Sequence, residues 1–200
     1  MPPDRDVGQF DERAHDYDTG WRATLHRRIV TNTVRIALAL GPVPRRVLDV
    51  GCGTGILLEE MRRLVPPDTE LVGIDAAPNM IEVARSRASD GRPEFHLGVA
   101  EKLPFPDSHF DLIVSTTSFD HWEDQQQGLN ECARVLESSG TAVIADQFSN
   151  LLLGTLVLSR RGKARTKPRA ERLLRSAGFT TIEWHDVYTV LIKAFSAKAP

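Results

Sequence analysis

The sequence predicts an α/β protein with a doubly wound, mostly parallel sheet of about seven strands. Strand-like and helix-like segments alternate from about residue 45 onward, as parallel strands joined by crossover helices require. Two apolar strand segments end in an aspartate, Asp49 and Asp75, and the first leads into a glycine-rich turn. The last two strand segments, 180–185 and 187–195, are too close together for a crossover, so they predict an antiparallel hairpin.

The expected elements follow in order along the chain. Before the first strand, apolar residues recur at helical spacing from Trp21 to Leu40, and Gly41-Pro42 ends that helix. Short apolar runs bounded by turn residues predict parallel strands over about 46–50, 70–75, 94–99, 110–115 and 141–146. Helical spacing predicts further helices over about 56–65, 78–88, 123–137 and 170–177. The turn residues between these segments are Pro66-Pro67, Asp90-Gly91 and Ser138-Ser139-Gly140.

These elements predict a single domain over residues 1–200. Four parts are expected within it: an N-terminal helical cap over 1–44, a ligand-binding core over 45–146, a lid or linker over 147–165, and a C-terminal helix and hairpin over 166–200. The cap and the lid are the two parts that the sheet does not need. Since ligands of such sheets bind outside the carboxyl ends of the strands, we expect both parts to shape the site there.

Composition narrows the possible functions. The 200 residues suit one α/β domain, and a net charge of −2 with a pI of about 6.3 gives no global reason to expect nucleic acid or an anionic membrane as a partner. The longest apolar run, Leu151–Leu158, is far shorter than the ~20 residues of a membrane span. Because the opening residues are polar, we expect a cytoplasmic protein. Cys52 and Cys132 suggest neither a disulfide framework nor a metal site.

The glycine-rich turn indicates the class of ligand. A dinucleotide fingerprint reads Gly-x-Gly-x-x-Gly/Ala, but here Gly55 comes one residue early and Ile56 holds the fingerprint position. Asp49, two residues before the first glycine, would repel a pyrophosphate and attract a ligand that carries ammonium and sulfonium groups. S-Adenosylmethionine (SAM) has both groups, and its ribose diol suits Asp75. A phosphate-binding Walker loop is excluded because no Gly-Lys-Ser/Thr follows the turn.

At these residues the chain resembles the class I SAM-dependent methyltransferases, whose first motif is commonly hydrophobic-x-Asp/Glu-x-Gly-x-Gly-x-Gly. Four further segments are similar to the small-molecule branch often called type 11 methyltransferases: 10–18, 75–80, 103–107 and 110–115. The resemblance implies a Rossmann-like sheet of strand order 3-2-1-4-5-7-6. It also implies SAM as the cofactor and S-adenosylhomocysteine as the product.

The resemblance further implies which residues hold SAM. They are Tyr17, Asp49, Gly51, Cys52, Gly53, Asp75, Ala76, Met80, Ala100, Glu101 and Ser115. Asp49 would receive the methionine ammonium, the 51–53 backbone would line the methionine part, and Asp75 would accept both ribose hydroxyls. Ala76 and Met80 would cover the adenine.

For some of these cofactor-binding residues, the sequence leaves a second interpretation open. The family often has an aspartate for the adenine amine where this chain has Val99, so Ala100, Glu101 or water is expected to hold that amine. The Ser115 carbonyl is expected to face the ammonium. Tyr17 resembles the tyrosine that closes over the methionine carboxylate, but it also suits a packing aromatic. Cys52 suits a small loop residue, although a thiol near a helix start can become reactive.

A catalytic base is needed only if the acceptor begins protonated. His121 is the candidate, because it follows the fourth strand at the ligand-binding edge and an imidazole titrates in the right range. The alternative is a histidine that caps or packs the next helix. The remaining histidines are expected to be cap, hairpin, strand or loop residues: His15, His26, His185, His96 and His109.

The function expected from these features is methyl transfer from SAM to a small-molecule acceptor at oxygen or nitrogen. One alternative is a SAM-binding regulatory or scaffold protein without turnover. Another is a protein or RNA methyltransferase, for which the basic segment 160–169 is the only support. The same segment suits a solvated link, or a lid over an anionic or lipid-like acceptor.

Overall fold

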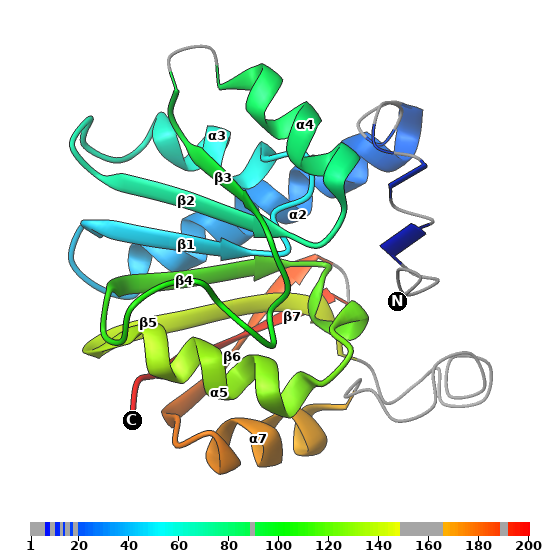
Figure 1. Ribbon diagram of the computed structural model, residues 1–200. Helices are drawn as coiled ribbons and strands as arrows, with labels where there is room; N and C mark the ends of the chain where they lie inside the picture. Colours follow the sequence, from blue (N-terminus) through cyan, green and yellow to red (C-terminus); the bar gives the residue numbers. More distant parts are fainter. Residues whose placement is uncertain are drawn as a thin grey trace, which may run out of the picture.

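The computed structural model describes residues 7–8, 11–12, 14, 17, 20–88, 91–148, 166–188 and 192–200. Within them, seven strands form one sheet in the order β3-β2-β1-β4-β5-β7-β6, which confirms the expected order (Figure 1). The strands are β1 Arg46–Val50, β2 Glu70–Asp75, β3 Glu94–Leu97, β4 Phe110–Thr116, β5 Leu136–Gln147, β6 Thr180–Tyr188 and β7 Ile192–Lys198. The helices are α2 Gly20–Ala39, α3 Ile56–Arg62, α4 Pro78–Arg87, η1 Phe119–His121, α5 Gln125–Val135 and α7 Lys167–Ser176.

The pairing of the strands puts the ends of the parallel strands at one edge. Strands β1 to β5 pair in parallel, whereas β7 is antiparallel to both β5 and β6. The C-terminal hairpin is therefore confirmed. Because β1 lies between β2 and β4, the loops that follow these three strands meet at the carboxyl edge of the sheet.

Two hydrophobic cores cover the two faces of the sheet. Alternate residues of β4 contribute to them: Ile113 packs on the side of α5 and α7, and Leu112 and Val114 pack on the side of α2, α3 and α4. Figure 1 shows these two groups of helices on opposite sides of the sheet. Because both faces of the sheet are buried, the sequences of the central strands are continuous apolar runs.

The end of α5 differs from the expected one. The helix stops at Val135, and the predicted turn over 138–140 is wrong because β5 already begins at Leu136. The register with β4 slips there, since Phe110 pairs with Leu136 but Leu112 pairs with Thr141. The strand therefore bulges between Leu136 and Thr141, where the small polar residues 138–140 lie.

The two C-terminal strands are also placed differently from the prediction. Strand β6 continues to Tyr188, so the predicted break at residue 186 is wrong. Across the hairpin, Asp186 pairs with Lys193 and His185 Nε2 lies 2.8 Å from Ser196 Oγ. These cross-strand contacts extend the strand beyond its apolar part. Strand β3 is shorter than predicted and ends at Leu97.

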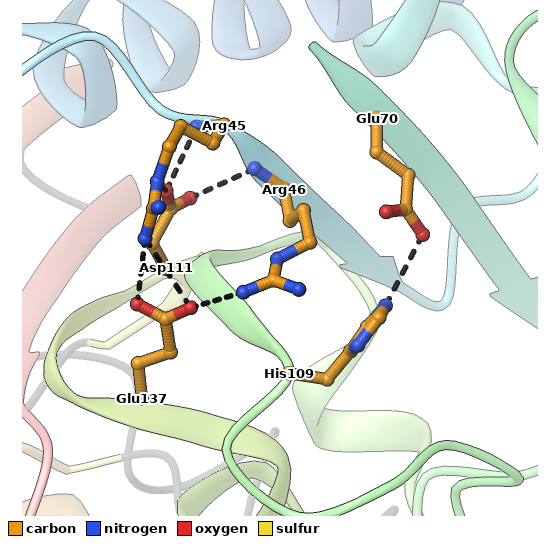
Figure 2. Close-up of polar contacts among 6 residues, drawn as sticks. All are labelled: Arg45, Arg46, Glu70, His109, Asp111 and Glu137. Atoms are coloured by element: carbon orange, nitrogen blue, oxygen red, sulfur yellow. Dashed lines mark hydrogen bonds and ion pairs between the residues drawn. The ribbon is translucent and has the colours of Figure 1, made fainter.

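Polar and charged side chains connect the strand starts at the amino edge. Figure 2 shows six of them: Arg45, Arg46, Glu70, His109, Asp111 and Glu137. The Asp111 carboxylate accepts the backbone N–H groups of Arg45 and Arg46 at 2.8 and 3.1 Å, and Glu137 pairs with both guanidinium groups. His109 Nε2 lies 3.2 Å from Glu70 Oε1.

Some expectations fall outside the described residues. They concern the apolar run 151–158, most of the predicted lid and of the basic segment, and His15. The division into a cap, core, lid and C-terminal part stays a prediction. In the described part of the chain, none of the helices has the length and hydropathy to cross a bilayer.

Candidate functional site

A cavity of about 350 Å³ opens at the carboxyl edge of the sheet. Its walls come from the loops that follow β1, β2, β3 and β4, together with α2 and residues of the N-terminal cap. Most of the residues expected from the sequence line it: Tyr17, Gly51, Cys52, Gly53, Asp75, Ala76, Met80, Ala100, Glu101 and His121. Parallel pairing thus brings together residues as far apart in the sequence as Gly51 and His121.

Asp49 and Ser115 do not line the cavity but are buried at the ends of β1 and β4, which are adjacent strands. Asp49 is 1% exposed, and neither of its carboxylate oxygens has a hydrogen-bond partner among the described residues. The Ser115 hydroxyl also lacks such a partner. A buried acceptor without a donor is costly. The two side chains therefore need a polar ligand or water.

The charge of Asp49 is not balanced within the described structure. Burial raises the pKa of Asp49 well above its ordinary value, and the neighbouring charge of Asp75 raises it further. A cation placed between these carboxylates would reverse both effects. The electrostatics of this edge therefore favour a positively charged ligand.

Unlike Asp49, Asp75 accepts hydrogen bonds from backbone N–H groups. Its Oδ2 accepts the Gly53 N–H at 2.8 Å, and its Oδ1 accepts the Ala77 N–H at 2.9 Å. Burial raises the pKa of Asp75, and the backbone hydrogen bonds from Ala77, Gly53 and Ala76 partly offset that rise. A carboxylate can accept about four hydrogen bonds, so its oxygens keep capacity for a ribose hydroxyl.

The glycine-rich turn is bound to β2 through its backbone. The N–H groups of Gly51 and Cys52 donate to the Ile74 carbonyl at 2.8 and 3.1 Å. Gly51 has a φ of +75°, and a Cβ there would lie 1.8 Å from the Ser118 Oγ. A glycine is needed at this position for both the conformation and the close approach. The N–H groups of Gly51 and Cys52 are therefore already used within the protein, and the turn contributes its close-packed backbone to the cavity wall.

Cys52 is not activated by its position near a helix start. Burial raises the pKa of its thiol well above the ordinary value, and the charges of Asp75 and Asp49 add to the rise. A raised pKa favours the neutral thiol, so the interpretation of Cys52 as a small loop residue is the one we retain. Its Sγ lies 2.8 Å from the position that a Cβ on Gly73 would take, which shows how closely it packs.

The wall expected for the adenine combines small and apolar residues. Met80 is buried and packs with Ala14 and Ala77. Val99, which replaces the family aspartate, is 45% exposed and lines the cavity without a polar group. Glu101 lines the same wall, but its Oε1 accepts the Asp124 N–H at 3.0 Å, so this carboxylate also supports the start of α5.

Asp11, for which the family-like segment 10–18 indicated no role, connects the N-terminal cap to α4. Asp11 Oδ1 accepts the Asn79 N–H at 2.7 Å, and the Asn79 side chain donates to the Asp11 carbonyl at 3.2 Å. Tyr17 and His26 then form an edge-to-face ring contact of 5.4 Å, and both line the cavity. The pattern Phe-Asp before the cap helix was the available signal for Asp11.

His121 lies in a short turn after β4 that several elements hold in place. The Asp120 N–H donates to Asp146 Oδ2 at 3.0 Å, and Gln125 Nε2 donates to the Phe119 carbonyl at 2.9 Å. His121 Nε2 lies 3.1 Å from Asp120 Oδ1. The sequence did not indicate the contact between Asp120 and His121, because the side chains of adjacent residues need not meet.

Residues 48–144 match the family model described as "Methyltransferase domain". A demethylmenaquinone methyltransferase of Thermotoga maritima is 37% identical over 129 residues, which are 64% of this chain and 51% of that protein. The ajmaline N-methyltransferase of Rauvolfia serpentina is 27% identical over 200 residues, covering 90% of this chain and 66% of the relative. The chain spans about half the length of the first curated relatives it matches.

The fold recurs in solved structures. A chain of the complex between the Haloferax volcanii Trm112 methyltransferase activator and a methyltransferase superposes with a TM-score of 0.80 at 22% identity, covering 96% of this chain and 98% of the other. At that identity the likeness shows the fold alone. The matched family model, the strand order and the acidic glycine loop agree with one another. Residues 48–144 are thus a methyltransferase domain of the class I SAM-dependent type.

Proposed function

We propose that this protein binds SAM in the cavity at the carboxyl edge and transfers its methyl group to a small molecule. The observation that carries the proposal is the buried Asp49 carboxylate, whose oxygens have no partner among the described residues and whose pKa is raised beside Asp75. The methionine ammonium and the sulfonium of SAM supply the positive charge that this edge favours. The matched family model supports the same ligand.

Each side of the cavity would take one part of the cofactor. Asp49 would attract the ammonium directly or through water, and Asp75 would accept the ribose hydroxyls with the capacity left on its oxygens. Met80 and Ala76 would cover the adenine. When bound, SAM supplies a methyl group on a cationic sulfur. The chain itself has to exclude water and hold the acceptor in line with that methyl group.

The acceptor is expected on the side formed by the cap and the turn after β4. Tyr17, His26, His121 and Trp122 line that side, and none of the described lining residues is a lysine or arginine. This lining favours a neutral or cationic acceptor with an oxygen or nitrogen nucleophile. The relatives named above act, by their names, on a quinone precursor and on an amine. A screen should therefore include phenols, amines and quinols.

Calorimetry tests the cofactor assignment. We expect SAM and S-adenosylhomocysteine to bind, NAD not to bind, and Asp75→Ala to weaken SAM binding about 10- to 100-fold, since a hydrogen bond to a charged group contributes roughly 1.5–3 kcal/mol. The matched control is Asp111→Asn at the opposite edge, which should bind SAM as the wild type does. Preferred NAD binding, or wild-type affinity in a folded Asp75→Ala protein, would defeat the assignment.

Turnover separates an enzyme from a regulatory protein. Release of S-adenosylhomocysteine with any acceptor of the screen would support methyl transfer. Tight SAM binding without turnover across all three acceptor classes would instead favour the hypothesis of a SAM-binding regulatory protein.

A further inference from the structure

The cavity at the carboxyl edge follows the ends of three neighbouring strands. Asp49 lies at the end of β1, Asp75 ends β2, and Val99 comes two residues after β3. The order β3-β2-β1 puts Asp75 between the other two positions. If Asp49 attracts the ammonium of SAM and Asp75 accepts its ribose, the base on the far side of the ribose extends toward the loop after β3.

The loop after β3 begins beside Asp75. The Gly98 N–H donates to the Asp75 carbonyl at 2.9 Å, and a Cβ on Gly98 would lie 2.7 Å from Ile74 Cδ1, so the loop is packed against β2. The next residue, Val99, lines the cavity and is 45% exposed. Its carbonyl accepts the Lys102 N–H at 3.2 Å. A base that follows the ribose therefore meets Val99.

This end of the cavity offers few acceptors for a base amine. Of the described lining residues in segments 76–80 and 98–101, only Glu101 carries an oxygen in its side chain. Glu101 Oε1 accepts the Asp124 N–H at 3.0 Å, and the Glu101 carbonyl accepts from Gln127 Nε2 at 3.5 Å. Both groups of Glu101 are thus engaged with the start of α5, and the wall beside Val99 is apolar.

The same end of the cavity lies at the margin of the sheet. Strand β3 is the edge strand of the described sheet, and Leu97 at its end is 55% exposed. A group attached to the base that leaves the cavity past Val99 therefore reaches the edge of the sheet rather than another strand.

We propose that Val99 determines which bases the cofactor site accepts: the site does not require the base amine, and it tolerates an apolar group attached to that amine. This inference rests on the proposed SAM binding and adds the range of cofactor analogues. A site built to hydrogen-bond a group rejects a ligand that lacks it, because its own polar atoms are then left unpaired. A valine sets no such condition.

Calorimetry with three ligands tests the inference: S-adenosylhomocysteine, its analogue with purine in place of adenine, and its N6-benzyl derivative. For the wild type, removal of the amine should change Kd by no more than about threefold, since a group in contact only with water contributes little to affinity. The benzyl derivative should bind at least as tightly as S-adenosylhomocysteine, because its ring buries apolar surface on Val99. A loss of more than about tenfold with either analogue would overturn the inference.

Val99→Asp should create the missing preference. The purine analogue should then bind about 10-fold or more weakly than S-adenosylhomocysteine, the factor that a hydrogen bond to a charged group supplies. Val43→Asp is the matched control, since Val43 is 61% exposed in the loop before β1 at the opposite edge. It should keep the wild-type ratio of the two Kd values. An unchanged ratio in a folded Val99→Asp protein would contradict the position of Val99 beside the base.

The outcomes for the two proposals can be told apart. If Val99→Asp does not fold, the wild-type ratios decide. A wild type that binds none of the three ligands would defeat the proposed function and this inference with it. A wild type that binds S-adenosylhomocysteine but rejects the purine analogue would defeat the inference alone.

Discussion

Strand β4 has a histidine–carboxylate pair at each end: His109 with Glu70 at the amino edge and His121 with Asp120 at the carboxyl edge. The two contact distances are 3.2 and 3.1 Å, so the two pairs are alike in separation. Their surroundings are not. Glu70 is 44% exposed and lies on the protein surface, whereas Asp120 is 9% exposed and its partner lines a cavity.

The aspartates at the two edges differ in the same way. Asp111 at the amino edge accepts two backbone N–H groups and contacts the Arg45 guanidinium, as Figure 2 shows. Asp49 at the carboxyl edge is buried and lacks any such donor in the described structure. Acids that join strand starts stabilise the fold, whereas an acid kept without a partner costs stability that a cationic ligand can restore.

The largest expected effect separates the two histidines. His121→Ala should lower turnover about 100- to 10,000-fold, the usual contribution of a positioned base, and it should leave SAM affinity nearly unchanged. With a phenol acceptor, the loss should shrink as pH rises and the phenol ionises unaided. The measurement is the pH–rate profile of both proteins with an acceptor from the screen.

His109→Ala is the matched control at the amino edge, and its turnover should equal that of the wild type. Parallel profiles with equal turnover for wild type and His121→Ala would remove His121 from the mechanism. A lower Tm with near-normal turnover would then favour the alternative that this histidine only packs the turn.

A smaller effect is expected for the two aspartates: Asp49→Asn and Asp111→Asn should change the Tm in opposite directions. Asp49→Asn should weaken SAM binding about tenfold or more, because a charged hydrogen-bond partner is lost. The unliganded variant should nevertheless have a higher Tm, by about 2–4 °C for each kcal/mol regained, because a buried charge is removed. Asp111→Asn should instead lower the Tm and keep SAM affinity. Calorimetry and thermal melts measure both quantities, and a lower Tm in Asp49→Asn would contradict the unbalanced charge.

The pH dependence follows from the raised pKa of Asp49. Between the ordinary value near 3.8 and the raised value, the folded protein holds a proton that the unfolded chain has lost. The free energy of unfolding of the unliganded protein should therefore fall as pH rises through this window. SAM prefers the ionised carboxylate, so its affinity should rise over the same window. Asp49→Asn should show neither trend from this group.

The smallest effect tests the amino edge itself. Arg45 is 72% exposed, and its guanidinium contacts Asp111 at 3.5 Å and Glu137 at 3.1 Å. Arg45→Ala should lower the free energy of unfolding by only about 0.2–1 kcal/mol, and high salt should reduce the difference. SAM affinity should stay at the wild-type value. A large loss of SAM binding in this variant would show that the two edges are coupled.

Local residue patterns were enough to predict the strands, the glycine turn and the longer helices at the site, but not the short η1 helix Phe119–His121. Apolar runs that end in Asp49 and Asp75 gave two neighbouring strands, and the glycines after the first run gave the turn, because strand burial and tight backbone turns depend on local residue types. The hairpin followed from the short spacing between its strands. The resemblance supplied the strand order, which local patterns do not encode.

Element boundaries and side-chain partners depended on packing between distant segments. Pairing of Leu136 and Thr141 with β4 placed residues 138–140 in a bulge of β5, and pairing with β7 extended β6 to Tyr188, because hydrogen bonds between distant segments outweigh local turn preferences. The contact between Asp120 and His121, and the absence of a donor for Asp49 among the described residues, depend on how β4, β5 and β1 pack. Sequence spacing can predict that acidic residues lie at one edge of the sheet, but packing decides which of these carboxylates receives a hydrogen-bond donor.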